Sequence, residues 1–260
     1  MIPYFRFTYI PLGPLHIQVW GLFVAAGLVA ATLVGRREAR RRGSDPEAFT
    51  DFASWIIVCA LIAARLFHAY VYEPAIYLAD PLKVFRVWEG GMSSYGGFIG
   101  AAVGALAFAK RRRIAFRAYA DVACYAFPLG YGIGRIGCFL IHDHPGTLSQ
   151  SLLAVQYPGG SRLDHGLLLS LLGFGLFAAF AVLNGRRAAT KKADGGFLPL
   201  LMLSYGAVRF VLDFYRAYDL PGSDVRYFSL TPAQYGSICV VVAGAYLLFR
   251  RVPSGRRRPL

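Results

Sequence analysis

The chain's first apolar stretch, together with the arginines that close it, reads IQVWGLFVAAGLVAATLVGRREARRR, residues 17–42. Residues 17–35 carry no charged side chain. A helix crosses a bilayer with about 20 mostly apolar residues, so this stretch predicts a membrane span. Lys and Arg concentrate in short cytoplasmic loops, which places the run from Arg36 to Arg42 on the cytoplasmic side.

The same pattern recurs along the chain. Six more apolar stretches lie at about 52–72, 93–109, 118–141, 166–183, 197–213 and 230–249. Basic runs that begin at Lys110, Arg186 and Arg250 follow the third, fifth and seventh stretches. With seven spans, all four basic clusters fall on one side of the membrane. We therefore predict an all-α, polytopic membrane protein with seven transmembrane helices, an outer N-terminus, a cytoplasmic C-terminus and a single domain over 1–260.

Composition supports the membrane assignment and excludes other classes. The chain is 56% hydrophobic and 16% charged, whereas soluble domains are about one quarter charged. The net charge of +14 would suggest nucleic acid as a partner, but such binding leaves the apolar stretches unexplained, so we expect no nucleic acid. The first stretch is not a cleavable signal, because its positive charge follows the apolar region. The four cysteines share no CxxC spacing and form no disulfide scaffold.

Several ionisable residues fall inside the predicted spans: Arg65, Arg135, and Arg209 with Asp213. Each costs about 2.5–3.5 kcal/mol at the membrane centre on insertion scales, so such residues usually line a site or cavity. The three arginines lie in the outer halves of their spans, where each could snorkel to the headgroups. Three together favour an anion-binding cavity, because the arginine fork donates two hydrogen bonds to one phosphate.

Charged residues near the end of the sixth span share one helix face. Arg209, Asp213 and Arg216 are spaced i, i+4 and i+7. They could form a structural ion-pair ladder, or Asp213 could orient an arginine toward a ligand. The two interpretations are compatible.

Glycines recur at helical spacing in two spans. Residues 132–137 carry the letters of the dinucleotide fingerprint G-x-G-x-x-G, but that motif requires a preceding strand, which an apolar span does not supply. Gly96, Gly100 and Gly104 recur every four residues. We interpret both sets as surfaces where a helix or a lipid approaches the backbone closely.

Histidine and aspartate cluster in the outward loop after the fourth span. His142, Asp143 and His144 are followed by Asp164 and His165. These side chains can bind metals, but the spacing is not diagnostic and a solvated loop is the more common explanation, so no metal site is predicted. A histidine here is a better candidate for a proton acceptor, because its pKa is ordinarily near neutral.

Four segments resemble a known family. They are GPLHIQVWGL (13–22), DPLKVFRVWEGGMSSYGGFIG (80–100), GRIGCFLIHDHPG (134–146) and YGAVRFVLDFYR (205–216). Together they are similar to the prolipoprotein diacylglyceryl transferases, and they extend over most of the chain.

The resemblance implies an activity, partners and a location. The family transfers the diacylglyceryl group of phosphatidylglycerol to the lipobox cysteine of a preprolipoprotein and releases glycerol 1-phosphate. The implied partners are phosphatidylglycerol, the preprolipoprotein signal peptide and membrane lipid, without a cofactor. The implied location is the prokaryotic cytoplasmic (inner) membrane, with the active site toward the outer leaflet. Arg135 matches the signature arginine and Arg209 the other key arginine, while Arg86, Gly96 and Gly97 lie in the best-matching block as expected lipid-binding residues.

The chain also departs from the family pattern. Tyr95 replaces a histidine, while Cys138, Ile141 and Asp143 replace two asparagines and a glutamate. Asp213 stands in for another glutamate. A phenol is mostly protonated at neutral pH, so Tyr95 is a poor base, although it can hydrogen-bond a lipid oxygen.

The departures leave the proton acceptor open. We expect His142 or His144 to act as the base. Alternatively, the arginines could favour the acceptor thiolate without a dedicated base. The expected catalytic residues are Tyr95, His142, Asp143, His144 and Asp213. The alternative function is a non-catalytic or altered-specificity paralogue that binds anionic phospholipid in the same pocket.

Overall fold

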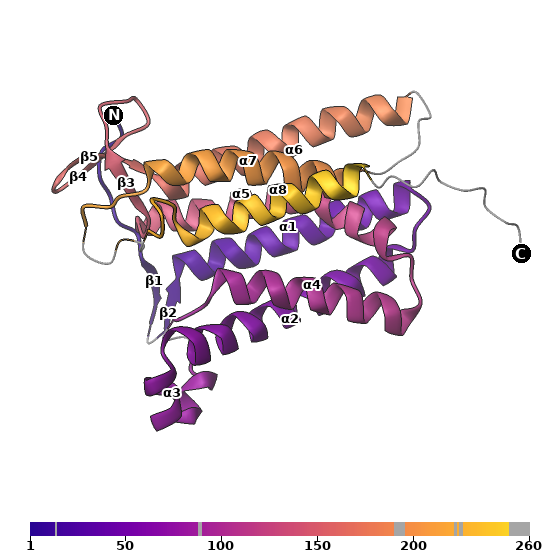
Figure 1. The fold of residues 1–260 in the computed structure, drawn as a ribbon, viewed down its shortest axis with the longest axis horizontal. Helices are drawn as coiled ribbons and strands as arrows, with labels where there is room; N and C mark the ends of the chain where they lie inside the picture. The colour runs from indigo at the N-terminus through magenta and orange to yellow at the C-terminus, as the bar shows by residue number, and fades with distance from the viewer. Residues whose placement is uncertain (14, 88–89, 190–195, 221–222, 224–225, 250–260) are drawn as a thin grey trace, which may run out of the picture. The chain divides into compact units, whose positions relative to one another are not determined.

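A computed structural model describes the chain except for residues 14, 88–89, 190–195, 221–222, 224–225 and 250–260. Long α-helices dominate it (Figure 1), which confirms the predicted helical fold. They are α1 (Val19–Arg41), α2 (Pro46–Phe67), α4 (Ser94–Arg112), α5 (Phe116–Ile141), α6 (His165–Ala189), α7 (Phe197–Leu212) and α8 (Pro232–Phe249). Shorter helical turns are a π-helical turn (His68–Tyr72), α3 (Pro74–Ala79), and 3-10 turns at Pro81–Phe85 and Asp213–Tyr215.

Six helical segments of the described chain are long and apolar enough to cross a membrane. They are Val19–Arg41, Pro46–Tyr72, Phe116–Ile141, His165–Arg186, Phe197–Tyr215 and Pro232–Phe249. The predicted third span forms α4, which has 19 residues but is less apolar because it contains four glycines and ends in Lys110, Arg111 and Arg112. The chain is therefore a multi-pass membrane protein, and the count of seven spans stays a prediction.

Local sequence sets where these helices begin. Asp45 precedes α2 and accepts a hydrogen bond from the Glu47 amide, while Pro46 occupies the first helical position. Ser93 caps α4 through the amide of Gly96. Asp164 caps α6 through the amide of Leu167. Each cap satisfies an amide that has no partner within the helix.

The described residues group into two compact units, residues 35–123 and residues 1–34 with 124–260. The prediction of a single domain stays a prediction. The 35–123 unit has a core of Ala39, Phe49, Phe52, Ala105, Phe108, Tyr119 and Val122. The core of the other unit contains Tyr125, Phe180, Phe197 and Leu201.

Glycines bring helices together within each unit, as predicted. In the 35–123 unit, α2 lies against α4, and a Cβ atom at Gly100 would collide with Ala63 and with the backbone of Cys59. In the other unit, a Cβ at Gly137 of α5 would lie 2.9 Å from the Cβ of Phe23 in α1. The G-x-G-x-x-G letters therefore belong to a helix-packing surface.

Two small sheets extend the helical fold where no strand was predicted, and the first predicted span, 17–35, is wrong at Ile17 and Gln18, which belong to a strand. A hairpin pairs β1 (Tyr9–Leu12) with β2 (Leu15–Gln18). The second sheet, with order β3-β5-β4, contains β3 (Pro145–Leu148), β4 (Val155–Tyr157) and β5 (Gly160–Asp164). The N-terminus lies beside this sheet (Figure 1), because the amide of Ile2 donates to the Ala154 carbonyl and its carbonyl accepts from the Gln156 amide.

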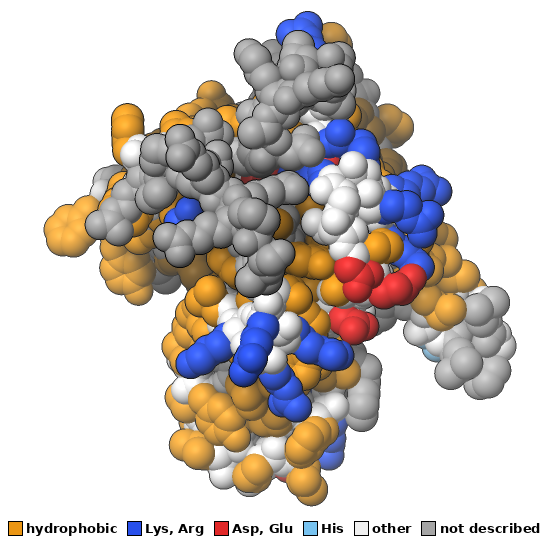
Figure 2. Space-filling view, turned by 90° about the vertical axis from the view of Figure 1, so that its right-hand side faces the viewer, with side chains coloured by type: hydrophobic (Ala, Val, Ile, Leu, Met, Phe, Trp, Pro, Cys, Tyr) orange, Lys and Arg blue, Asp and Glu red, His pale blue; other side chains and the backbone are white. Residues whose placement is uncertain are grey.

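Two basic clusters lie at one end of the 35–123 unit, where α1 and α4 end. Arg42 pairs with Glu38 at 2.5 Å and with Asp121 at 2.7 Å, and Arg112 lies 3.5 Å from Asp51. Figure 2 shows Lys and Arg side chains gathered on this face, with acidic side chains beside them. Lys191, Lys192 and the run from Arg250 to Arg258 lie outside the described residues.

Candidate active site

Arg135 lies near the C-terminal end of α5, with neighbours on the same helix against its side chain. Tyr131 precedes it by one turn, and the guanidinium carbon lies 5.1 Å from the centre of that ring. Cys138 follows at i+3, with its sulfur 3.7 Å from Nη1 of Arg135. Residues at these spacings share one helix face, so α5 itself supplies two of the side chains that position the arginine.

Tyr205 of α7 connects Arg135 to the second arginine. Its hydroxyl donates to the hydroxyl of Tyr131 at 3.2 Å, and the two rings meet edge to face. Tyr205 also interacts electrostatically with both Arg135 and Arg209. Sequence reasoning missed both tyrosines. The only signal was the position of Tyr205 one turn before Arg209.

Arg209 is oriented by Asp213, as the i, i+4 spacing predicted. Nη1 of Arg209 lies 2.7 Å from Oδ1 of Asp213, which has no exposed surface. The other carboxylate oxygen accepts a hydrogen bond from the Thr231 hydroxyl. Thr231 and Gln234 cap the start of α8 reciprocally, with the Thr231 amide 2.9 Å from Oε1 of Gln234. The capping box of α8 therefore supports the arginine through Asp213.

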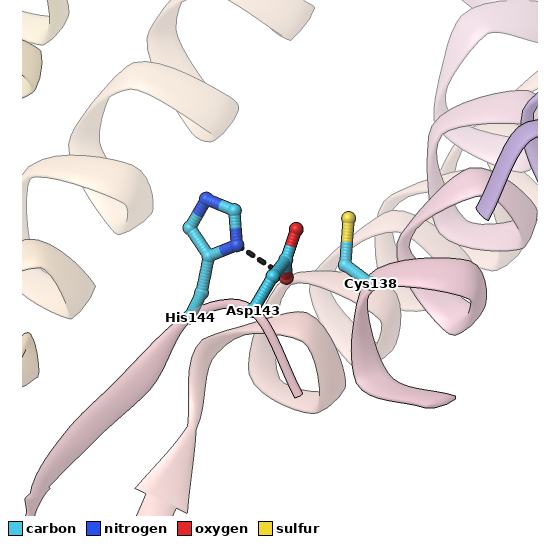
Figure 3. A group of neighbouring side chains, drawn as sticks. All are labelled: Cys138, Asp143 and His144. Atoms are coloured by element: carbon cyan, nitrogen blue, oxygen red, sulfur yellow. Dashed lines mark ion pairs between the residues drawn. The ribbon is translucent and has the colours of Figure 1, made fainter. Parts of the chain in front are cut away.

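Asp143 and His144 extend the group around Arg135. They form an ion pair in the segment between α5 and β3, and Figure 3 shows both side chains beside Cys138. Asp143 also interacts electrostatically with Arg135. The structure thus brings together Arg135, Cys138, Asp143 and His144.

His142 lies in a buried group of aromatic and acidic side chains, and its expected role as a base stays a prediction. Its Nδ1 lies 2.7 Å from Oδ2 of Asp164, and that oxygen also accepts the Tyr157 hydroxyl at 2.6 Å. The imidazole stacks on Tyr4 with ring centres 5.0 Å apart, and also contacts Phe139. Burial and the Asp164 carboxylate both raise the pKa of Tyr157 above its usual range. His142 has φ of 52°, which turns its side chain toward the β-sheet.

Arg65 also differs from the expectation of an anion-binding arginine. Its guanidinium donates to the main-chain carbonyls of Lys83, Val84, Arg86, Gly90 and Gly91. Tyr77 packs against its other side, 5.2 Å from the guanidinium carbon. Arg65 is 4% exposed, so its buried charge is satisfied by backbone dipoles and it anchors the main chain at these five residues.

Arg86, Tyr95, Gly96 and Gly97 lie in the same unit as Arg65. Tyr95 is half-buried in the first turn of α4. A Cβ atom at Gly96 would collide with Ala63 and Phe67, whereas one at Gly97 would make ordinary contacts. The first glycine therefore permits helix packing, while the second has room for a side chain. The predicted site residues form two groups, one in each unit.

An open pocket of about 300 Å³ lies beside Gly90 and Gly91, whose carbonyls Arg65 binds. His68, Glu73 and Lys83 contribute its ionisable groups, with Nε2 of His68 3.4 Å from the Glu73 carboxylate. Sequence reasoning did not single out these three residues as a site, although they lie within 16 positions of one another.

Comparison with known proteins identifies the family. A family model described as prolipoprotein diacylglyceryl transferase matches residues 8–250. The phosphatidylglycerol–prolipoprotein diacylglyceryl transferase of Chromohalobacter salexigens is 34% identical over 242 residues, covering 92% of this chain and 89% of that protein. Those of Bordetella parapertussis and Solidesulfovibrio magneticus are 33% and 31% identical and cover 94% and 96% of this chain, and 95% and 96% of their own lengths. The chain belongs to the prolipoprotein diacylglyceryl transferase family.

Proposed function

We propose that the chain transfers the diacylglyceryl group of phosphatidylglycerol to the lipobox cysteine thiol of preprolipoproteins. The family match over residues 8–250 carries this proposal. Its relatives are named for the same donor and acceptor classes. The pairing of Arg135 and Arg209 through Tyr205 supports it, because two cations on neighbouring elements suit a phosphate diester.

The proposed reaction forms a carbon–sulfur bond and breaks a carbon–oxygen bond. The acceptor sulfur attacks the glyceryl carbon that bears the phosphate, and the headgroup leaves as glycerol 1-phosphate. Negative charge develops on the departing phosphate, where Arg135 and Arg209 stabilise it. Asp213 holds Arg209 in place at 2.7 Å, so the arginine needs no rearrangement when charge develops.

His144 is the proposed acceptor of the thiol proton. Asp143 pairs with its Nδ1, which leaves the other ring nitrogen to accept a proton. An oriented imidazole beside a carboxylate is the usual arrangement of a general base. Tyr95 would hydrogen-bond a lipid oxygen, while Arg86, Gly96 and Gly97 would contact the lipid.

The proposed setting is the prokaryotic inner membrane, with seven spans, an outer N-terminus and a cytoplasmic C-terminus. Two basic clusters at one end of the 35–123 unit support this orientation. Arg135, Asp143 and His144 would then lie toward the outer leaflet, where a signal peptide presents its cysteine. A C-terminal reporter that is active only outside the cytoplasm should stay inactive, and activity would contradict the orientation.

The function is tested with purified protein, phosphatidylglycerol and a lipobox peptide. We expect a thioether-linked diacylglyceryl peptide to form with release of glycerol 1-phosphate, both detected by mass spectrometry. A peptide with serine in place of the lipobox cysteine is the matched control and should stay unmodified. The protein could instead bind phosphatidylglycerol, form no product and fail to rescue a transferase-depleted cell. That result would support the non-catalytic or altered-specificity paralogue.

A further inference from the structure

Cys138, Asp143 and His144 bring three kinds of metal ligand together near the end of α5 (Figure 3). Each offers one ligand atom, and these atoms all lie within 4.8 Å of one another. Thiolate, imidazole and carboxylate are the ligands that bind Zn²⁺ in proteins, and a sulfur ligand disfavours Mg²⁺ and Ca²⁺. We propose that these residues bind one thiophilic divalent metal ion of the Zn²⁺ class. This site goes beyond the transfer reaction and does not rest on it. Metal binding occupies the imidazole that the transfer reaction uses as its base, so the metal-bound protein is inactive in transfer.

The geometry requires only local movement. Zn²⁺ binds sulfur at about 2.3 Å and nitrogen or oxygen at about 2.0–2.2 Å, so tetrahedral ligand atoms lie roughly 3.3–3.8 Å apart. The atoms must therefore approach by at most about 1.5 Å. Asp143 and His144 follow the end of α5 at Ile141, and each side chain is 32% exposed. Rotation of these two side chains closes the site without displacing the helix.

The sulfur of Cys138 already accepts hydrogen bonds. Nη1 of Arg135 lies 3.7 Å from it, and the indole N–H of Trp20 donates to the same atom. Such donors around a metal-bound thiolate stabilise its negative charge and orient it. Cys138 is 4% exposed, so these contacts matter more than they would in water.

The charges of the site balance around a divalent ion. The Cys138 thiolate and the Asp143 carboxylate neutralise its two positive charges, while the thiol proton passes to solvent. Arg135 then keeps its positive charge beside the thiolate. Three protein ligands leave one tetrahedral position for water or an anionic oxygen.

Cobalt(II) titration tests the proposal directly. Full-length protein purified in detergent, with any histidine tag removed, is titrated with Co²⁺ alone and then with Zn²⁺. We expect a near-ultraviolet sulfur-to-cobalt charge-transfer band at one equivalent, which Zn²⁺ abolishes. Cys138→Ser should lose this band, and His144→Gln should weaken Co²⁺ binding at least about tenfold, because each removes one ligand.

Matched variants separate this site from other thiols and histidines. Cys239 and His16 are exposed and lie outside the group, so Cys239→Ser and His16→Gln should leave the band and the affinity unchanged. Circular dichroism confirms that each variant is folded, and either ligand variant alone suffices if the other fails. The absence of a charge-transfer band in the wild type, or its persistence in Cys138→Ser, would overturn the proposal.

Discussion

Nδ1 of His142 lies 2.7 Å from Oδ2 of Asp164, and the two side chains are only 1% and 0% exposed. His144, two residues later, is one-third exposed and pairs with Asp143. The positive φ of His142 directs its imidazole into the aromatic group at the sheet. Two histidines separated by one residue therefore have different surroundings, and substitutions at each should have different effects.

Replacing His144 should affect the reaction more than the fold. We expect His144→Gln to lower turnover of a lipobox peptide by about 100-fold, the usual effect of losing a general base. Binding of phosphatidylglycerol should change little. His142→Gln should instead lower the free energy of unfolding by about 1–3 kcal/mol, because Asp164 keeps its burial but loses a partner. Turnover, its pH profile and thermal unfolding distinguish the two. If both variants keep wild-type turnover, thiol activation by the arginines becomes the better account.

Arg135 should be required for lipid binding because its guanidinium donates two parallel hydrogen bonds, and not only because it is positively charged. Arg135→Ala should weaken phosphatidylglycerol binding by about 1.5–3 kcal/mol, the range for hydrogen bonds to charged groups. Arg135→Lys should recover little, because an ammonium group cannot donate two parallel bonds. Arg117→Ala, an exposed arginine on the same helix, is the matched control. Full rescue by lysine would mean that charge alone suffices.

Asp213 should stabilise the fold through Arg209. Asp213→Asn preserves the shape and can still accept the Thr231 hydroxyl, but it removes the carboxylate charge at 2.7 Å from Arg209. Breaking a buried ion pair on one side costs about 3–5 kcal/mol, which thermal unfolding would detect. Thr231→Val tests the neighbouring hydrogen bond alone and should cost about 1–3 kcal/mol. Equal losses in both variants would argue against the ion pair as the main contribution.

Arg65 should be needed for the order of the main chain whose carbonyls it binds, at residues 83–86 and 90–91. Arg65→Met leaves several carbonyls between Lys83 and Gly91 without their donor, at about 1–3 kcal/mol for each buried group left unsatisfied. We expect faster limited proteolysis and faster hydrogen exchange between residues 80 and 93. Arg112→Ala removes an exposed pair at 3.5 Å and should change stability by less than about 1 kcal/mol. Wild-type protection in Arg65→Met would refute the anchoring role.

The free energy of unfolding should depend on pH through the ion pair between Arg162 and Asp219. Arg162 donates to Oδ1 of Asp219 at 2.9 Å and lowers the pKa of this carboxyl. A lowered folded-state pKa means that the contribution is complete above the unfolded value, about 3.9, and is lost as pH falls through the folded value. Wild type should therefore be more stable than Asp219→Asn at neutral pH, and the difference should shrink as pH falls below about 3.9 and disappear below the folded-state pKa. A difference that does not vary with pH would exclude this linkage.

The helices could be predicted from sequence because their pattern is local. The apolar stretch 17–35 forms α1 from Val19 onward, and the helix extends to Arg41 because arginines are good helix formers and exposed ends tolerate charge. The strands could not be predicted in the same way. β4 has three residues and β5 five, too short for alternation to stand out. β4 also forms a bridge to Ile2, which is more than 150 residues away.

The candidate site was predictable where spacing on one helix determined it. Arg209 and Asp213 are one turn apart, so their ion pair followed from sequence. Arg65 was misinterpreted because its partners are main-chain carbonyls, which residue identity does not reveal. The sequence did not distinguish His142 from His144, because Asp164, which pairs with His142, lies 22 residues further along the chain.

Asp164 uses both of its carboxylate oxygens for different parts of the fold. Oδ1 accepts the Leu167 amide in the first turn of α6, while Oδ2 accepts from the Tyr157 hydroxyl in β4 and contacts His142 after α5. The external sheet and the start of a membrane helix therefore lose their hydrogen bonds together if this side chain moves. The two elements should open as one cooperative unit. Loosening of the sheet should therefore also open the first turn of α6.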